Sequence, residues 1–409
     1  MKYDLIVIGG GASGMCAAIA AARRGASVCI LEQGKLPGRK LLATGNGKCN
    51  YTNELMDASY FRSDDPAGIG AVLEQYPAPA IVAFFEELGI RPMSRNGYLY
   101  PASGQASSVR KALEMECRYL KVAIRTEFRA EKAEKLPNGD FQVWSGDACC
   151  RGRKLVLSCG SCAAPKTGSD GSGYSLAAQL GHSFIPPVPA LVQLECTGKF
   201  FRNWSGVRVQ GKVTLFTGGK AAGSDQGELQ LTEYGISGIP VFQVSRYASK
   251  ALAGHIPVAV ELNFFPEQNP RKFSEEMSRF LEKQSYKGIS DALGGALPEK
   301  LTAVLLGRAG IKPDWIWPSI PASRQRMLLG LMQRFNLEVS GTKGFDSAQV
   351  CAGGVRLREI CANTMESLLV PGLYLTGELL DADGLCGGYN LHWAWATGLI
   401  AGKHAGENL

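Results

Sequence analysis

The sequence predicts an α/β fold in which a Rossmann-like dinucleotide-binding domain is interrupted by an insert with a β-rich module and a helical module. Three observations predict it: a glycine-rich strand-to-helix motif near the N-terminus, a strand–acid–helix segment near the C-terminus, and a change from short strands to helical periodicity between them. The 409 residues are enough for two or three domains. We expect the dinucleotide-binding domain over 1–192 and 339–409, with an insert over 193–338 that is β-rich to about 255 and helical from about 256.

The first motif has the order and spacing of a dinucleotide site. Residues 3–8 form an apolar run that suits a buried parallel strand, and Gly9, Gly11 and Gly14 then match G-x-G-x-x-G. Gly9 permits a tight turn, Gly11 lets the backbone approach a pyrophosphate, and Gly14 lets the helix pack on the strand. Ala12 and Ser13 begin a helix whose N-terminus attracts phosphates. A second strand, 26–31, ends in Glu32, which can accept hydrogen bonds from a ribose.

The segment after Glu32 favours FAD over NAD. A simple NAD domain would begin another helix here, whereas residues 34–53 form a long loop rich in glycine, asparagine and basic residues. Such a loop suits a backbone that wraps an extended cofactor. Arg39, Lys40 and Lys48 are placed to reach a phosphate or the reactive ring.

The C-terminal segment supplies a second contact region, as a long flavin dinucleotide requires. Residues 372–376 predict a short strand that leads into Gly377 and Glu378, and an apolar helix is expected from about 391 to 405. We expect Glu378 to bond the ribityl chain or the pyrophosphate region. We expect Gly387 and Gly388 to let the backbone lie against the flavin ring. Free N–H groups near Asn390 and Leu391 would then face the pyrimidine edge, where negative charge develops on reduction.

The middle of the chain agrees with this interpretation. Residues 154–161 read as a strand followed by a small-residue turn at Cys159 and Gly160, where FAD enzymes of this architecture often carry Ala-Thr-Gly. Phe128 lies where the backbone of such enzymes commonly touches the adenine. Cys159 and Cys162 form a C-x-x-C motif, but no second strand–G-x-G-x-x-G–helix unit accompanies it. We therefore expect no catalytic dithiol, and we expect NAD(P)H to dock only transiently as electron donor.

Composition narrows the other possibilities. The net charge of +7 is spread over the whole length, and no basic–aromatic stripe indicates nucleic acid. Asp4 and three consecutive glycines argue against a signal peptide, and no apolar run reaches 18 residues. Twelve cysteines without an even framework and four isolated histidines predict reduced thiols and no metal site. We expect a cytoplasmic protein that acts on a small molecule, without a nucleic-acid or membrane partner.

Several longer strings resemble the BaiN-like (YhiN-like) flavoprotein family over nearly the whole chain. They are Gly38-Arg39-Lys40, residues 49–53, 97–101, 353–355 and 364–367, and the stretch from Gly377-Glu378 to Tyr389-Asn390-Leu391. The resemblance implies non-covalent FAD in a split domain of the glutathione-reductase type. It also implies cofactor contacts from Gln33, Thr44, Gly45, Asn46, Cys49, Asn50, Asp383 and Tyr389, beside those named above. The sequence departs from the usual family pattern at Lys48, where arginine is commoner, and at His392, where glutamine is commoner and where we expect an approach to the ring or substrate.

The resemblance implies a function as an FAD-dependent oxidoreductase. The best-defined activity of the family is reduction of a conjugated enone in a steroid or bile-acid-like substrate, with NAD(P)H as the electron source. An oxidase of a small amine or aminoketone that uses O₂ is the alternative, and a flavoprotein of RNA modification or redox sensing is a third hypothesis. The sequence leaves open the catalytic residue, the choice between NADH and NADPH, and the oligomeric state.

Overall fold

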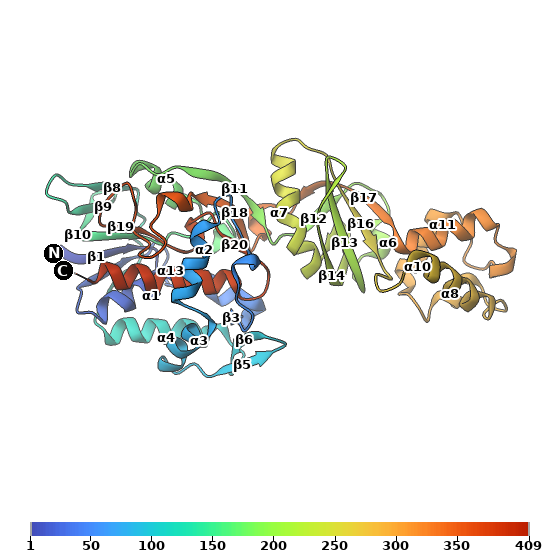
Figure 1. Ribbon diagram of the computed structural model, residues 1–409, viewed down its shortest axis with the longest axis horizontal. Helices are drawn as coiled ribbons and strands as arrows, with labels where there is room; N and C mark the ends of the chain where they lie inside the picture. Colours follow the sequence, from blue (N-terminus) through green and yellow to red (C-terminus); the bar gives the residue numbers. More distant parts are fainter. Residues whose placement is uncertain (1, 408–409) are drawn as a thin grey trace. The chain divides into compact units, whose positions relative to one another are not determined.

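The computed structural model describes residues 2–407 and divides into two compact units. Unit 1 comprises Met1–Val188 and Gln349–Leu409, and unit 2 comprises Pro189–Ala348. Both ends of the chain therefore build unit 1, as the colours at the two ends of the scale show in Figure 1.

The sheet of unit 1 brings the ends of five parallel strands to one edge. Its order is β7-β2-β1-β10-β9-β8, with β19 beside β10. The parallel strands are β1 (Lys2–Ile8), β2 (Val28–Leu31), β7 (Ala123–Arg125), β10 (Ala148–Leu157) and β19 (Leu373–Leu375), and the antiparallel ones are β8 (Lys132–Lys135) and β9 (Phe141–Ser145). Ile8 pairs with Leu31 and with Leu157, which in turn pairs with Leu375. The residues that follow these strands therefore meet at a single edge, where open α/β sheets bind their ligands.

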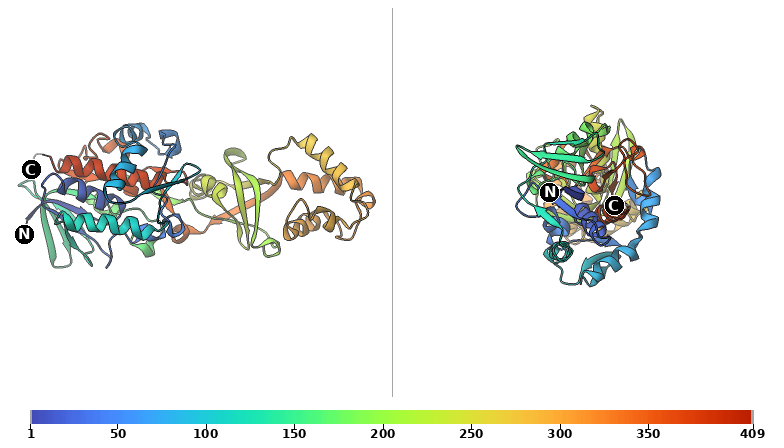
Figure 2. Two further views of the ribbon diagram at one scale, coloured as in Figure 1. Left: turned by 90° about the horizontal axis from the view of Figure 1, so that it is seen from below. Right: turned by 90° about the vertical axis from the view of Figure 1, so that its left-hand side faces the viewer.

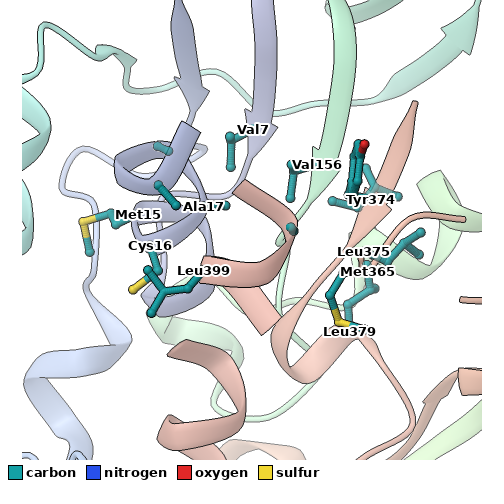
Figure 3. Packing of buried hydrophobic residues seen from close by; sticks show 14 of the residues in the cluster. Val7, Met15, Cys16, Ala17, Val156, Met365, Tyr374, Leu375, Leu379 and Leu399 are labelled. Carbon is teal, nitrogen blue, oxygen red and sulfur yellow. The ribbon is translucent and has the colours of Figure 1, made fainter. Parts of the chain in front are cut away.

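Two helices from opposite ends of the chain pack at backbone distance. They are α1 (Ala12–Ala22) and α13 (Tyr389–Ala405), which run side by side in Figures 1 and 2. A Cβ atom at Gly398 would lie 2.3 Å from the carbonyl oxygen of Ser13, and one at Gly402 would lie 2.1 Å from that of Ala17. Only glycine allows so close an approach, and around it apolar side chains such as Cys16 and Leu399 fill the core (Figure 3).

Smaller elements complete unit 1. The helices are α2 (Ala67–Gln75), α3 (Ala78–Glu87), α4 (Ala106–Tyr119) and α5 (Ser172–Gln179). The short strands form one three-stranded sheet, β3 (Thr52–Asn53), β6 (Tyr98–Pro101) and β5 (Pro92–Arg95), and two pairs, β4 (Phe61–Arg62) with β20 (Asp383–Gly384) and β11 (Phe184–Ala190) with β18 (Val350–Val355). Helix α12 (Gly344–Ser347) belongs to unit 2. Among residues 2–407 no single helix combines the length and the apolar character needed to cross a membrane. The pair α2 and α3 meets that test only jointly, across a 45° bend.

Unit 2 contains a closed barrel with the strand order β12-β15-β14-β13-β16-β17. The strands are β12 (Leu194–Cys196), β13 (Val207–Thr217), β14 (Lys220–Thr232), β15 (Gly235–Ser237), β16 (Val258–Asn263) and β17 (Phe335–Thr342). The helices are α6 (Phe201–Trp204), α7 (Ile239–Ala253), α8 (Pro270–Glu282), α9 (Ile289–Leu293), α10 (Glu299–Ala309) and α11 (Ala322–Gln333). One apolar cluster runs through barrel and helices, with Trp204 and Phe335 among its fully buried members.

The structure corrects the expected extent of the helical module. Residues 256–338 were expected to be helical, but Val258–Asn263 and Phe335–Thr342 are barrel strands and the helices occupy only Pro270–Gln333. The physical reason is the period of burial, because side chains alternate between buried and more exposed along Val258–Asn263 and along the first six residues of β17. The helical periodicity of the sequence therefore applies only to the residues between the two strands.

Candidate functional site

The turn between β1 and α1 has the geometry of a phosphate cradle. Gly9 has φ +99°, and a Cβ there would lie 2.4 Å from the carbonyl oxygen of Ser158. A Cβ at Gly14 would lie 1.9 Å from the carbonyl oxygen of Gly9. By contrast, no atom lies within 4 Å of the Cβ position of Gly11, and no side chain caps the N-terminus of α1. The turn is thus tightly packed at Gly9 and Gly14 and open at Gly11. On the open side, the first N–H groups of Ala12 and Ser13 fit an anionic group.

Glu32 is held beside this turn with both carboxylate oxygens fixed. The backbone N–H of Gly10 donates to Oε2 at 2.9 Å, and that of Gly34 donates to Oε1 at 2.7 Å. The carboxylate is part-buried, and each oxygen keeps a further lone pair for a ribose hydroxyl. The N–H of Phe128 donates to the backbone oxygen of Glu32 at 2.9 Å, so the expected adenine contact lies next to the acid. Gln33 instead donates its side chain to the backbone oxygen of Gly168, which gives it a role in holding that loop.

Replacing Glu32 by alanine is expected to weaken FAD binding by about 1.5–3 kcal/mol, or roughly 10- to 150-fold, because it removes a charged hydrogen-bond acceptor. The measurement is the dissociation constant of FAD by fluorescence titration of the deflavinated protein. Glu127→Ala is the matched control, since Glu127 is an exposed acid nearby whose ion pair with Lys35 spans 4.0 Å. Equal FAD affinity in Glu32→Ala and the parent would place the ribose elsewhere.

The acid from the C-terminal end of the chain lies at the same edge of the sheet. Lys40 donates to Oε2 of Glu378 at 2.6 Å, and the Ser161 hydroxyl donates to the same oxygen at 2.9 Å. Gly377 has φ +67°, and a Cβ there would lie 2.6 Å from Oγ of Ser13 in the first turn of α1. Residues predicted separately at the two chain ends are therefore brought together. Ser161 was not predicted, although its place directly after Cys159 and Gly160 in the small-residue turn was the available signal.

The protein's own packing requires the glycines before α13. Gly388 has φ +93°, and a Cβ there would lie 2.6 Å from the backbone oxygen of Thr52; a Cβ at Gly387 would lie 2.7 Å from the ring of Tyr98. The Asn50 amide accepts from the N–H of Gly388 at 3.2 Å, which ties this turn to the loop after β2. No side chain caps α13, so the N–H groups at Tyr389, Asn390 and Leu391 stay available.

Two further polar residues predicted as cofactor contacts have structural roles. The Asn390 side chain accepts from the N–H of Gly384 at 2.8 Å and donates to its carbonyl at 2.9 Å, so it shapes the turn before α13. Asp383 is buried and its backbone pairs with Arg62.

The loop after β2 has an exposed part and a buried part. Arg39, Gly45, Asn46 and Lys48 are exposed, whereas Cys49 is fully buried. Burial raises the pKa of the Cys49 thiol to about 11, so this cysteine is neutral and serves in packing. Thr44 donates its hydroxyl to the carbonyl oxygen of Leu41 at 2.6 Å, which shapes the bend between the two parts.

Cys159 and Cys162 do not face each other. The Cys159 thiol donates to the carbonyl oxygen of Ile8 at 3.7 Å, and burial raises its pKa to about 12. The Cys162 sulfur lies 2.6 Å from the Cβ position of Gly171. The two cysteines of the C-x-x-C motif therefore have different neighbours.

His392 lies inside unit 1 and not on an open surface, contrary to the expected approach to ring or substrate. Nε2 donates to the carbonyl oxygen of Tyr76 at 2.9 Å, so Nδ1 accepts from the Thr52 hydroxyl at 2.8 Å. Burial lowers the pKa of this imidazole to about 4. The neutral ring thus joins α13 to β3 and to the end of α2.

This buried imidazole predicts an acid-sensitive fold. Between pH 6.5 and about 4 the unfolded chain binds a proton that folded His392 does not, so stability is present above 6.5 and falls by about 3 kcal/mol as the pH drops through this window. His392→Gln, which keeps a donor and an acceptor, should flatten this part of the profile. Urea unfolding of both proteins at pH 4.5 and 7 measures the difference. Parallel profiles would contradict a buried neutral imidazole.

The comparisons with known proteins agree with this geometry. The family described as "HI0933-like protein Rossmann domain" matches residues 3–404. The chain is 45% identical to a 3-dehydro-bile acid delta(4,6)-reductase from Clostridium scindens over 98% of both chains, and 32% identical to a ribosomal RNA dihydrouridine synthase from Haemophilus influenzae over 96% of both. Among solved structures, a 3-ketosteroid-delta4-(5alpha)-dehydrogenase from Rhodococcus jostii RHA1 has the same overall fold, with a TM-score of 0.53, 16% identity, and coverage of 100% of this chain and 97% of that one.

The fold and the site define an FAD-dependent oxidoreductase. An extended dinucleotide requires hydrogen-bond donors and acceptors in two places. The open turn at Gly11 with Glu32 beside it fits one of them, and Glu378 from the other end of the chain fits the second. The chain belongs to the HI0933-like protein family.

Proposed function

We propose that this protein is an NAD(P)H-dependent reductase of a conjugated enone in a small apolar, steroid or bile-acid-like substrate. The observation that carries the proposal is the 45% identity, over 98% of both chains, with the bile-acid reductase of Clostridium scindens. We place the reaction in the cytoplasm, with a small molecule as the only required partner. No second dinucleotide motif is present in the sequence, so the donor would dock transiently.

Residues from the two ends of the chain would bind different parts of FAD in unit 1. The N-terminus of α1 and Glu32 would hold the ADP part, and Lys40 and Glu378 would hold the ribityl chain. The N-terminus of α13 would face the pyrimidine edge, where its positive dipole end favours a reduced, anionic ring. When bound, FAD supplies the hydride that reduces the carbon–carbon double bond.

The reduction also needs a proton at the α-carbon of the enone, and we assign its donation to Tyr100. This residue lies on β6, with its ring edge 3.7 Å from the Cβ position of Gly45, in the loop expected to reach the ring. It is half-buried, and burial raises its pKa, so the phenol keeps its proton at neutral pH. A phenol in this state can donate a proton in the transition state.

Tyr100→Phe is expected to lower kcat for enone reduction by about 10²- to 10⁴-fold, the usual contribution of a general acid, with little change in KM. The rate of flavin reduction by NAD(P)H should stay the same, because that half-reaction needs no proton at this position. Tyr119→Phe on α4, whose side chain is 80% exposed, is the control. An unchanged kcat, or an equal loss in flavin reduction, would remove Tyr100 from this role.

Anaerobic stopped-flow spectroscopy of the FAD-loaded protein tests the function. Rapid bleaching by NADH or NADPH, reoxidation by a 3-oxo-4,6-diene bile acid and slow reoxidation by O₂ are expected. Fast reoxidation by O₂ after reduction by an aminoketone would favour the oxidase instead. Bleaching without steroid reoxidation would overturn the enone assignment while keeping the flavoenzyme.

A second candidate function is reduction of a uridine in ribosomal RNA, which the name of the Haemophilus influenzae relative suggests for that protein. One feature of this chain supports it: residues 270–334 contain eleven Lys and Arg against six Asp and Glu, so most of the +7 charge is concentrated there and not spread evenly. Incubating reduced protein with unmodified ribosomal RNA and assaying dihydrouridine by mass spectrometry separates the two candidates.

A further inference from the structure

The three-stranded sheet β3-β6-β5 presents two tyrosines and an arginine on one face. In its antiparallel register, Asn53 on β3 and Arg95 on β5 both pair with Tyr98 on the central strand β6. Directly paired residues share a face, and side chains alternate along a strand, so Tyr100 lies on that face as well. Burial follows the same alternation, because Tyr98 and Tyr100 are half-buried whereas Leu99 between them is buried. The side chains of Arg95, Tyr98 and Tyr100 form the tyrosine face of the sheet.

The tyrosine face borders two segments that are expected to contact the flavin ring. The Asn53 side chain donates to the carbonyl oxygen of Gly387 at 2.9 Å, and the Tyr98 ring lies 2.7 Å from the Cβ position of Gly387. The Tyr100 ring lies 3.7 Å from the Cβ position of Gly45. The two rings therefore extend from the turn before α13 to the loop after β2. Under the proposed position of FAD, a planar group held against this side of the flavin ring meets them.

Arg95 brings a positive charge to the tyrosine face. Its guanidinium carbon lies 5.9 Å from the centre of the Tyr100 ring, within the range of a cation–π contact, and its side chain is exposed. It forms no hydrogen bond or ion pair with residues 2–407, the part of the chain that the structure describes. Glu54 places a carboxylate near the hairpin turn, 3.8 Å from the Cβ position of Gly97, without pairing with this arginine. The guanidinium therefore keeps its N–H groups available for an anion.

We propose that the tyrosine face is the docking site of the nicotinamide nucleotide that reduces the flavin. Tyr98 and Tyr100 receive the nicotinamide ring by aromatic contact, and Arg95 binds the diphosphate, which lies one ribose away from that ring. Transfer of a hydride from the nicotinamide C4 atom to FAD moves one hydrogen and two electrons, and the nucleotide leaves as NAD⁺ or NADP⁺. The inference rests on the proposed function, which supplies both the donor and the position of FAD.

The charge and the exposure of Arg95 favour a nucleotide over the other ligands of the reaction. The diphosphate of FAD has its own expected site at the N-terminus of α1, with Glu32 beside it. The enone end of a steroid is uncharged and needs no guanidinium. A site made from one exposed arginine and two half-buried rings suits a donor that must leave before the substrate enters. It also agrees with the lack of a second G-x-G-x-x-G unit in the sequence.

Rapid-reaction and calorimetric measurements on the FAD-loaded full chain test this site. The dependence of the anaerobic bleaching rate on NADH or NADPH concentration gives the dissociation constant of the donor, and titration calorimetry gives that of NAD⁺ or NADP⁺. Arg95→Gln is expected to raise both constants about five- to tenfold, because it removes one charge-assisted contact to a phosphate. Lys111→Gln, which removes a positive charge from an exposed position on α4, is the matched control.

The tyrosine rings are tested by a separate pair of variants. Tyr98→Ala is expected to raise the same two constants about tenfold, and Tyr98→Phe should restore them, because phenylalanine keeps the ring and lacks only the hydroxyl. The FAD content and the circular dichroism of each variant show whether it is folded. Should Tyr98→Ala lose FAD, Arg95→Gln decides by itself, since that side chain is exposed and holds no other element in place.

The two half-reactions separate this inference from the proposed function. In Arg95→Gln the loss should appear in reduction by the nucleotide and not in reoxidation of dithionite-reduced flavin by a 3-oxo-4,6-diene bile acid. Unchanged donor constants in Arg95→Gln, or an equal loss in Lys111→Gln, would overturn the docking site. Slower reoxidation by the bile acid in Arg95→Gln would assign the arginine to the substrate and would also overturn it. A parent protein that the bile acid does not reoxidise would refute the enone function, whereas the docking site would still be decided by the donor constants.

Discussion

Gly398→Val is expected to abolish retention of FAD and to lower the stability of unit 1 by about 1–3 kcal/mol or more, the usual cost of overpacking a tight contact. The Cβ would lie 2.3 Å from the carbonyl oxygen of Ser13, and backbone cannot move aside as a side chain can. The substitution must therefore separate α13 from the first turn of α1. That turn carries the phosphate cradle, and α13 carries the second contact region, so both halves of the cofactor site are displaced.

The ratio of FAD to protein after purification and the melting temperature measure this effect. Gly307→Val in α10 is the matched control, because Gly307 is also helical but has no atom within 4 Å of its Cβ position. A Gly398→Val protein that purifies with full FAD and the parent melting temperature would show that the close approach of the helices does not hold the site together.

His182→Ala is expected to destabilise unit 1 by about 2–4 kcal/mol, because it removes a buried side chain that satisfies two polar partners. Nδ1 donates to Glu359 at 2.9 Å, and Nε2 accepts from the Ser367 hydroxyl at 2.8 Å. The Ser367 oxygen also accepts from the N–H groups of Leu369 and Val370. The imidazole thus fastens the segment before β19 to the start of β11.

Urea unfolding, monitored by the release of FAD, measures this loss of stability in unit 1. Ser183→Ala is the control, since the Ser183 hydroxyl donates to the same Glu359 from an exposed position and its removal should cost much less. Equal losses of stability in the two variants would show that the buried imidazole adds nothing beyond a surface contact.

The residue types of Ser367, His182 and Glu359 suggest a hydrolytic triad. However, the Ser367 hydroxyl is buried and occupied by backbone donors, so the cluster is structural.

The elements of unit 1 that follow local rules were predictable from sequence. The strand at 3–8, the helix after Gly14, the strand before Glu32 and the C-terminal helix were expected and are confirmed, with ends that differ by a few residues. Each depends on short-range chemistry: β-branched runs, a glycine at a tight turn, and small residues on one helix. The helical range of the insert was partly wrong, because the two strands that border it are stabilised by pairing with distant barrel strands.

The roles of individual site residues were harder to predict from the sequence than the elements of the fold. Gln33 was expected to contact the cofactor, but its side-chain amide donates to the backbone oxygen of Gly168. The Asn390 side chain bonds Gly384, and the contact expected there stays a prediction for its backbone N–H. Sequence alone cannot distinguish these cases, because an amide suits a ligand and a neighbouring backbone equally well. Gly387 and Gly388 were expected to make room for the flavin ring, and the structure adds a second reason for them, because Tyr98 and Thr52 take their side-chain space.

The sequence by itself determined that this chain has a split dinucleotide-binding fold, and it predicted two contact regions at opposite ends of the chain with Glu32 and Glu378 as their acids. Those conclusions depend on spacing along the chain, which local geometry converts directly into turns and strand ends. Only the tertiary structure decided that Ser161 joins Lys40 at Glu378, that His392 is buried, and that the Cys159 thiol bonds the carbonyl oxygen of Ile8. The physical reason is that these contacts join residues up to 340 positions apart, whose approach is set by the close packing of α1 against α13 and by strand register, and neither leaves a local signal in the sequence.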